Sequence, residues 1–332
     1  MNERELEVAG ITEPGLRKAY LHCSELLKAQ AKARGSGTQI RFMFPVEKRP
    51  YFEVFFAFIT YLDDIVDVRD HSVEVRAKRL DEWETLFSAA LKDELPGKPS
   101  SRDEESDSAL AQAFVHLMRT WELPLDEVPA WLEAQRTALL TTEYQTAEDL
   151  ESFIDTVTLM PAYWANPMLG AIGGDADEAC RHATTSFQLI DFMWDLREDL
   201  GVGRLYLPLD HLARFDLDRE TVEAQLETGR ISASLRALMA FEAKLARQHL
   251  EQGRAWPGKL HRTSRTFVEW ELAANEMRLE EMEKSDFEHL SPRFKPGTSF
   301  KAGVLKRTFG DIARAIHINR TTGRDRVPHP IR

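Results

Sequence analysis

The chain has 332 residues, of which 43% are hydrophobic, including seven Trp and eighteen Phe. This length allows one large domain or two smaller ones, and the apolar content is ample for a buried core. The formal net charge of −12 argues against general nucleic-acid binding, which needs a basic surface. Only Cys23 and Cys180 occur, so no disulfide framework or cysteine-rich metal site is indicated, which fits a reducing compartment.

The N-terminus and the lengths of the apolar runs bear on the compartment of the protein, and the C-terminal end is basic. The N-terminus lacks the basic and apolar regions of a signal peptide, and no apolar run approaches the ~20 residues of a membrane-spanning helix. We therefore expect a soluble cytoplasmic protein with no integral membrane segment. Residues 301–332 hold eight Lys or Arg against two Asp. From about residue 318 we expect a basic tail, either loosely ordered or acting as a lid on an anionic ligand.

Apolar residues recur at helical spacing along nearly the whole chain, and no convincing series of alternating strands is present. Because this pattern is continuous, we predict an all-α protein with a single domain over residues 1–332. The predicted helices cover 14–34, 46–68, 72–93, 108–120, 126–142, 147–172, 176–200, 219–228, 231–252, 263–284 and 302–317.

Two features interrupt this helical pattern. Residues 95–107 are polar and contain Pro and Gly, which predicts an exposed loop. Pro161 and Pro167 fall inside an apolar pattern, so the helix over 147–172 should be kinked or broken there. Such a kink either lines a cavity or is a plain packing bend.

Two clusters of aspartates carry the main functional signal. Asp63 and Asp67 are spaced i, i+4, as are Asp191, Asp195 and Asp199, so each cluster should project from one side of a helix, with about 6 Å between successive carboxylates along the axis. They could be solvated surface charges. However, the first cluster directly follows an apolar stretch over residues 55–62, and buried carboxylates are costly unless they are paired or bind metal.

Two facing acidic rows across an apolar cavity suit one particular class of ligand. Mg²⁺ prefers oxygen ligands and bridges carboxylates to substrate phosphates, so a prenyl diphosphate, with its anionic head and apolar tail, fits well. Metal ions would stabilise diphosphate as a leaving group, aromatic side chains would face the allylic carbocation, and exclusion of water would protect that cation. We predict Mg²⁺ as cofactor. The predicted metal ligands and catalytic residues are Asp63, Asp67, Asp191, Asp195 and Asp199.

A glycine-containing segment follows the second cluster. Gly201 and Gly203 come after a predicted helix rather than a strand, and the third glycine of a dinucleotide-binding motif is absent, so that interpretation fails. The segment is better explained as the loop that leaves the helix. Arg204 and Tyr206 are then close enough in sequence to contact the same ligand.

The order and spacing of these motifs resemble the squalene/phytoene synthase family over about residues 20–290. The resemblance rests on Phe44-Pro45-Val-Glu47-Lys48-Arg49, on Tyr61-Leu62-Asp63-Asp64-Ile65-Val66-Asp67, on Gln188 through Asp199, and on Gly203-Arg204-Leu-Tyr206-Leu-Pro208. It implies an all-α isoprenoid synthase helical bundle with a central cavity, Mg²⁺-bound diphosphate and prenyl transfer.

The sequence also departs from the pattern of family members that join two prenyl diphosphates head to head. Thr60 and Trp194 stand where those members carry Arg, Asp191 stands where they usually carry Asn, and Phe153 replaces a tyrosine. Neither Thr nor Trp replaces the bidentate grip of Arg on phosphate. These losses affect the groups expected to serve a second diphosphate.

On this basis the chain resembles atypical members, the carbazole prenyltransferases of actinobacterial alkaloid biosynthesis. The resulting hypothesis is an enzyme that moves a short prenyl group, dimethylallyl, from its diphosphate to carbon of a small aromatic acceptor such as a carbazole. The predicted substrate-binding positions are Lys48, Arg49, Thr60, Phe153, Tyr163, Trp164, Trp194, Arg204 and Tyr206. Lys48 and Arg49 could equally be surface charges, and the aromatic residues could be core.

Two alternatives stay open. One is head-to-head condensation of two prenyl diphosphates, and the other is a non-catalytic protein that binds a prenyl diphosphate or acts as a scaffold. The sequence does not determine the oligomeric state or the residue that takes up a proton.

Overall fold

The computed structural model describes residues 1–33, 39–67, 71–95, 97 and 101–322. Within these ranges the chain is helical and contains no β-strand, only two isolated bridges, so the predicted all-α class is confirmed. The α-helices are α1 (Glu3–Val8), α2 (Pro14–Ala33), α3 (Arg49–Asp67), α4 (Val73–Leu91), α5 (Arg102–Thr120), α6 (Val128–Leu140), α7 (Ala147–Phe153), α8 (Met160–Leu169), α9 (Ala176–Trp194), α10 (Leu196–Gly201), α11 (Leu209–Arg214), α12 (Arg219–Thr228), α13 (Ala233–Gly253), α14 (Arg262–Lys284) and α15 (Thr298–Thr321). Shorter turns are η1 (Gln39–Met43), η2 (Leu125–Glu127), η3 (Ile154–Leu159), η4 (Trp256–Lys259) and η5 (Glu288–Leu290).

Side-chain caps determine where several of these helices begin. Ser72, Ser101 and Asp218 each accept a hydrogen bond from the backbone N–H three residues later, which satisfies a donor that the first helical turn leaves unpaired. Because α5 begins directly after Ser101, the predicted exposed loop over 95–107 is wrong in its second half. Acidic residues in the first turn of α5 add favourable charge at the helix N-terminus.

The predicted helix over 147–172 is divided into α7, η3 and α8, and of its two prolines only Pro161 lies at a division. The turn η3, between α7 and α8, is π-helical, and such wide turns are often found at functional sites. Pro161 lies in the first turn of α8 and has no N–H to donate; the carbonyl of Val157, four residues earlier, accepts from Nε1 of Trp131 at 2.8 Å instead. The interruption expected near Pro161 is therefore found, whereas Pro167 lies inside α8. Residues of η3 line the central cavity described below.

The predicted helix over 176–200 is interrupted at Asp195, between α9 and α10. The backbone N–H of Asp195 still donates to the carbonyl of Asp191 at 2.8 Å, and that of Asp199 donates to the carbonyl of Asp195 at 2.9 Å. Thus the helical i, i+4 relation of the three aspartates persists across the break.

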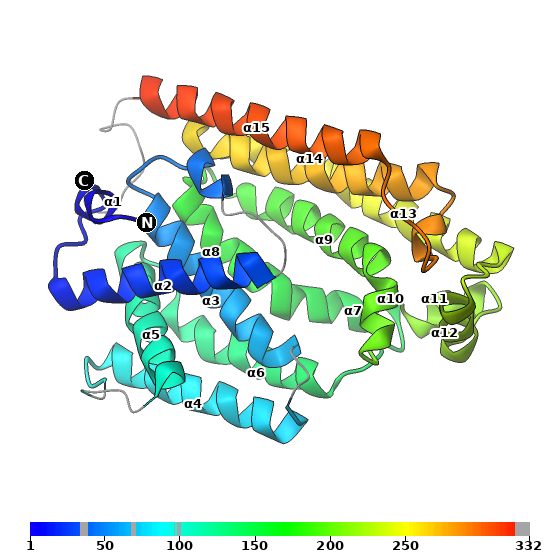
Figure 1. Cartoon of the computed structure of the whole chain (residues 1–332), viewed down its shortest axis with the longest axis horizontal. Helices are drawn as coiled ribbons and strands as arrows, with labels where there is room; N and C mark the ends of the chain where they lie inside the picture. Colours follow the sequence, from blue (N-terminus) through cyan, green and yellow to red (C-terminus); the bar gives the residue numbers. More distant parts are fainter. Residues whose placement is uncertain (34–38, 68–70, 96, 98–100, 323–332) are drawn as a thin grey trace.

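The helices form two groups that enclose the centre of the molecule (Figure 1). α9 packs against α13 and α14, and α3 packs against α2 and α5. Gly253 permits the close approach of α13 to α9, because a Cβ atom there would lie 2.6 Å from the Cα of Ala183. α15 lies beside α14 and is longer than predicted, so it includes the first residues of the expected basic tail. Residues 323–332 of that tail lie outside the described residues.

A large aromatic core holds α3 in place. Phe58 stacks on Phe114 with 3.6 Å between ring centroids, and Trp83, Trp131 and Trp164 surround the pair. Phe58 is fully buried, whereas Asp63, five residues later, lines the central cavity. One helix therefore contributes to both core and cavity. Within the described ranges, no helix combines the length and apolar content needed to cross a membrane.

Candidate active site

A cavity of about 540 Å³ lies between α3, α6, the η3 turn, α9, α10 and α14. One end is acidic and most of its remaining wall is aromatic or aliphatic. Its lining residues are Phe55, Phe56, Ile59, Asp63, Val66, Trp131, Gln135, Ala138, Phe153, Val157, Thr158, Pro161, Ala162, Ala165, Thr184, Phe187, Gln188, Asp191, Phe192, Asp195, Asp199, Arg204, Tyr206, Trp256, Phe267 and Glu271.

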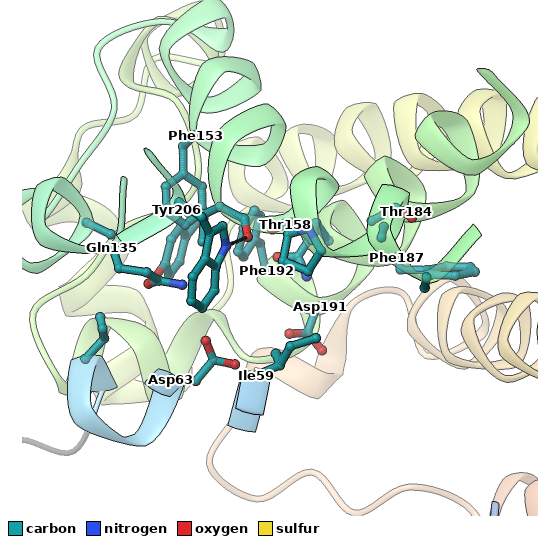
Figure 2. A pocket seen from close by; sticks show the side chains of 18 of the residues that line it. Ile59, Asp63, Gln135, Phe153, Thr158, Thr184, Phe187, Asp191, Phe192 and Tyr206 are labelled. Carbon is teal, nitrogen blue, oxygen red and sulfur yellow. Dashed lines mark hydrogen bonds between the residues drawn. The ribbon is translucent and has the colours of Figure 1, made fainter. Parts of the chain in front are cut away.

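The acidic end is built from both aspartate clusters. Asp63 comes from α3, whereas Asp191, Asp195 and Asp199 come from α9, α10 and the junction between them, and all four line the cavity. Figure 2 shows the carboxylates of Asp63 and Asp191 facing the same space from different elements. The side chain of Asp67 lies outside the described residues, so its predicted metal role stays a prediction.

The charges of these carboxylates are only partly compensated. Burial raises the pKa of Asp191, and this rise is opposed by Arg278, whose Nη1 lies 3.2 Å from Oδ1 of Asp191. Burial also raises the pKa of Asp195 to about 6, with further contributions from the negative charges of Asp191 and Glu198. A bound cation would relieve both the desolvation and the mutual repulsion.

The donor set suits a hard divalent cation, although it is not a preformed cage. Carboxylate oxygens are the ligands that Mg²⁺ prefers, and Mg²⁺ usually keeps some positions for water and substrate phosphate. Within the described residues, no three acidic, His or Cys side chains gather closely enough to form a complete site. Asp63, Asp191, Asp195 and Asp199 therefore fit a metal held jointly with a phosphorylated ligand.

Arg204 and Tyr206 both line this cavity, and their contact with a ligand stays a prediction. Arg204 is 8% exposed, and its Nη1 donates to the Tyr206 hydroxyl at 3.2 Å. The Tyr206 ring stacks on Phe192 with 4.2 Å between centroids and 4° between planes. Phe153 packs against it with 5.7 Å between centroids and a tilt of 41° (Figure 2). This places a guanidinium beside the acidic end and aromatic surface next to it.

Three of the predicted substrate-binding residues at or near α3 do not line the cavity. Lys48 is fully buried; its Nζ donates to the carbonyl of Met168 at 2.6 Å and lies over the ring of Trp121. Arg49 donates to the carbonyl of Phe44 at 3.0 Å and pairs with Glu5. Thr60 donates to Gln30 and to the carbonyl of Phe56, the latter an i−4 bond within α3.

The predicted aromatic slot of Tyr163, Trp164 and Trp194 is not assembled either. Trp164 is 1% exposed and donates to Glu127 within the aromatic core. Tyr163 is half-buried near Arg181 and does not line the cavity. Trp194 lies between His289 and Phe300 and lines a different pocket, between α14 and α15.

The structure adds lining residues that the sequence did not single out. Gln135 on α6 is 2% exposed, and its Nε2 has no hydrogen-bond partner among the described residues. Glu271 on α14 also lines the cavity, and burial raises its pKa to about 7. Neither residue lies in a recognisable motif. Gln135 is a single amide on a helix with both polar and apolar residues, and Glu271 is one of many charged residues on α14.

The chain matches the family described as Squalene/phytoene synthase over residues 39–299. It belongs to this family. Members of the squalene/phytoene synthase family are enzymes that transfer prenyl groups and bind diphosphate substrates with divalent metal ions.

Individual squalene/phytoene synthase relatives support this placement. Phytoene synthase 1 of Arabidopsis thaliana is 28% identical over 298 residues, covering 87% of this chain and 66% of that protein, so the chain spans about two thirds of its length. The 15-cis-phytoene synthase of Synechococcus elongatus is 27% identical over 252 residues, covering 71% of this chain and 75% of the relative.

Solved structures show the same fold at low sequence identity. Squalene synthase HpnC from Alicyclobacillus acidocaldarius matches with a TM-score of 0.71 at 20% identity, over 84% of this chain and 98% of that chain. A dehydrosqualene synthase in complex with ligand matches with a TM-score of 0.71 at 17% identity, over 90% and 98% respectively. The predicted isoprenoid synthase fold is thereby confirmed.

The predicted transfer to an aromatic acceptor is wrong. The relatives are named phytoene synthases and the similar structures are a squalene and a dehydrosqualene synthase, which favours the head-to-head alternative. The prediction failed because Thr60 and Trp194 were taken to remove the cations needed for a second diphosphate. In the fold, Arg278 supplies a guanidinium at Asp191 although the two residues are 87 positions apart in sequence.

Proposed function

We propose that this protein joins two prenyl diphosphates head to head and releases two diphosphates. The observation that carries this proposal is that acidic residues from α3 and from α9–α10 line one end of a cavity whose other walls are mostly apolar. That arrangement matches a ligand with an anionic head and a hydrocarbon tail. The family match and the names of the relatives support the same reaction class.

Mg²⁺ is the proposed cofactor, with Asp63, Asp191, Asp195 and Asp199 as its ligands and Asp67 as a further expected one. When bound, it would neutralise diphosphate and stabilise it as a leaving group. Arg204 is positioned at the same end to bind diphosphate oxygens, and Arg278 holds Asp191 in place. These groups position the donor so that its C1–O bond breaks and the bonding electrons leave with diphosphate.

The aromatic part of the cavity is proposed to stabilise the carbocation. The faces of the Phe192, Tyr206 and Phe153 rings are electronegative because of the ring quadrupole, and an allylic cation is attracted to them. The surrounding apolar wall keeps water from capturing that cation before it bonds to the second prenyl chain. No nucleophilic side chain is required.

The deciding experiment is incubation of the purified protein with Mg²⁺ and either farnesyl or geranylgeranyl diphosphate alone. We expect diphosphate release and an extractable hydrocarbon with twice the carbon number of the substrate. Asp63→Asn and Asp67→Asn should each remove both, whereas Asp210→Asn, which changes an exposed acid away from the cavity, should retain them. Binding without diphosphate release would identify a non-catalytic binding protein and overturn the proposal.

A further inference from the structure

Glu271 on α14 lies in the wall between two cavities. It lines the central cavity, and it also lines an outer pocket of about 560 Å³ between α14 and α15. It precedes Arg278 by seven residues, which places the two about 10.5 Å apart along the helix axis. Because Arg278 pairs with Asp191 at the acidic end, Glu271 is offset by two helical turns from that pair.

An ionised carboxylate in this position costs free energy, and few nearby groups offset that cost. Within the described part of the chain, its carboxylate makes no hydrogen bond or salt bridge. Burial raises its pKa to about 7, and the charge of Arg278 partly opposes this rise. Lys301 lines the outer pocket on the α15 side. A partly buried carboxyl that lines a cavity and exchanges a proton near neutral pH is a frequent feature of general bases.

The other ionisable residues of the central cavity already have roles. The aspartates at the acidic end, Asp63, Asp191, Asp195 and Asp199, are assigned to the cation. Arg204 is always charged and donates to the Tyr206 hydroxyl. Glu271 is therefore the lining carboxylate that binding and ionisation of the diphosphate leave unused.

The proposed reaction requires a proton acceptor. In the overall reaction two C–O bonds break and each electron pair leaves with a diphosphate, so in the absence of a reductant the joined hydrocarbon becomes neutral only after it has lost two protons, one for each diphosphate. In each such loss a C–H bond breaks, its electron pair forms a new carbon–carbon bond, and the proton passes to a base. The apolar wall excludes water, so this base must come from the protein or from released diphosphate.

We propose that Glu271 is a general base that takes up one of these two protons from a carbocation during condensation, while the other passes to released diphosphate. This inference rests on the proposed function. The carboxylate oxygen of Glu271 takes up the proton from the central cavity, and the same side chain borders the outer pocket, where Lys301 and the exposed Leu305 and Phe309 open to solvent. The proton therefore has a route toward solvent through the outer pocket, which Arg278 also lines.

The test is Glu271→Gln, which keeps the size of the side chain and removes its basicity. We expect hydrocarbon formation to fall by about 10²- to 10⁴-fold, while Mg²⁺-dependent diphosphate release falls by less than tenfold and carbon is diverted to an alcohol. Glu271→Asp should recover part of the hydrocarbon yield. In the wild type, the rate of hydrocarbon formation should rise with pH through a value near 7, and this limb should be absent in Glu271→Gln.

The matched control is Glu269→Gln on the same helix, whose carboxylate pairs with Arg314 and does not line the cavity. It should keep the wild-type product and rate. If Glu271→Gln forms hydrocarbon at the wild-type rate, the inference is overturned while the proposed function stands. If the wild type itself forms no hydrocarbon and releases no diphosphate, both fail. Circular dichroism of each variant checks that helical content is unchanged.

Discussion

Arg278 on α14 donates from Nη1 to Oδ1 of Asp191 on α9 at 3.2 Å. This contact joins a helix with no recognisable motif to the acidic end of the cavity. It supplies positive charge, which the uncharged side chains of Thr60 and Trp194 do not. Moreover, Thr60 bonds to Gln30 and Trp194 lines the outer pocket. The pair therefore bears directly on the proposed binding of diphosphate and metal.

Replacing Arg278 should weaken the proposed metal site. In Arg278→Gln, Asp191 loses the cation that opposes its burial, so its pKa rises further and protons compete more strongly with Mg²⁺. We expect the apparent Mg²⁺ affinity to fall by about 10- to 100-fold, measured as diphosphate release against Mg²⁺ concentration. Arg314→Gln on α15 is the control, since Arg314 pairs with Glu269 and Asp311 away from the cavity. An unchanged Mg²⁺ dependence in Arg278→Gln would show that the ion pair has no such role.

Asp195→Asn should move activity and stability in opposite directions. We expect turnover to fall at least about 100-fold, because several kcal/mol of stabilisation of the leaving group depends on bound metal. The folded protein holds the pKa of Asp195 at about 6, so without metal its free energy of unfolding decreases as pH rises from about 4 to 6. At pH 7.5 the variant should therefore be more stable by about 1–2 kcal/mol, after allowance for solvent screening. Urea unfolding in chelator measures this, and a less stable variant would contradict it.

Lys48 should impose a pH dependence on stability. Burial lowers its pKa to about 7, whereas an unfolded lysine titrates near 10.4. Between these values the unfolded chain binds a proton that the folded chain has lost, so the free energy of unfolding increases with pH. Lys48→Met should remove a slope of up to about 1.4 kcal/mol per pH unit between pH 7 and 8.5. The measurement is urea unfolding of wild type and variant at several pH values. If the two free energies of unfolding change with pH in parallel, Lys48 has no such effect.

We expect Gln135 to contribute to ligand binding and to lower the stability of the protein without ligand. Its buried Nε2 has no partner among the described residues, and such a donor costs free energy unless a ligand accepts from it. Gln135→Leu should keep or raise the free energy of unfolding by up to about 1 kcal/mol and raise KM about tenfold. Gln252→Leu, at an exposed position of α13, controls for the loss of an amide. A variant with unchanged KM would show that Gln135 does not contact substrate.

Structural features that depend on a few neighbouring residues are predicted well from the sequence. Most helices were found because apolar periodicity is a local property, and α12 was found at its observed ends. Asp63 and Asp191 were found because helical spacing sets the direction of each side chain. The start of α5 was missed because a single cap at Ser101 outweighs the polar composition of the segment after it.

Residues whose role depends on packing between distant segments were not predicted. Lys48 and Arg49 adjoin the first motif, yet the fold directs Lys48 into the core against Met168. Because α14 packs against α9, Glu271 lines the cavity and Arg278 reaches Asp191 at its acidic end. The prediction of an aromatic acceptor was wrong because it assumed that the cations for diphosphate must come from positions within the motifs, such as 60 and 194.

By itself, the sequence determined that the chain is helical and that it carries two acidic rows, since both follow from spacing along one segment. Only the tertiary structure decided which charged groups share a cavity with those rows. The physical reason is that the energy of a charge depends on the groups around it in space and on its burial, and helix packing sets both.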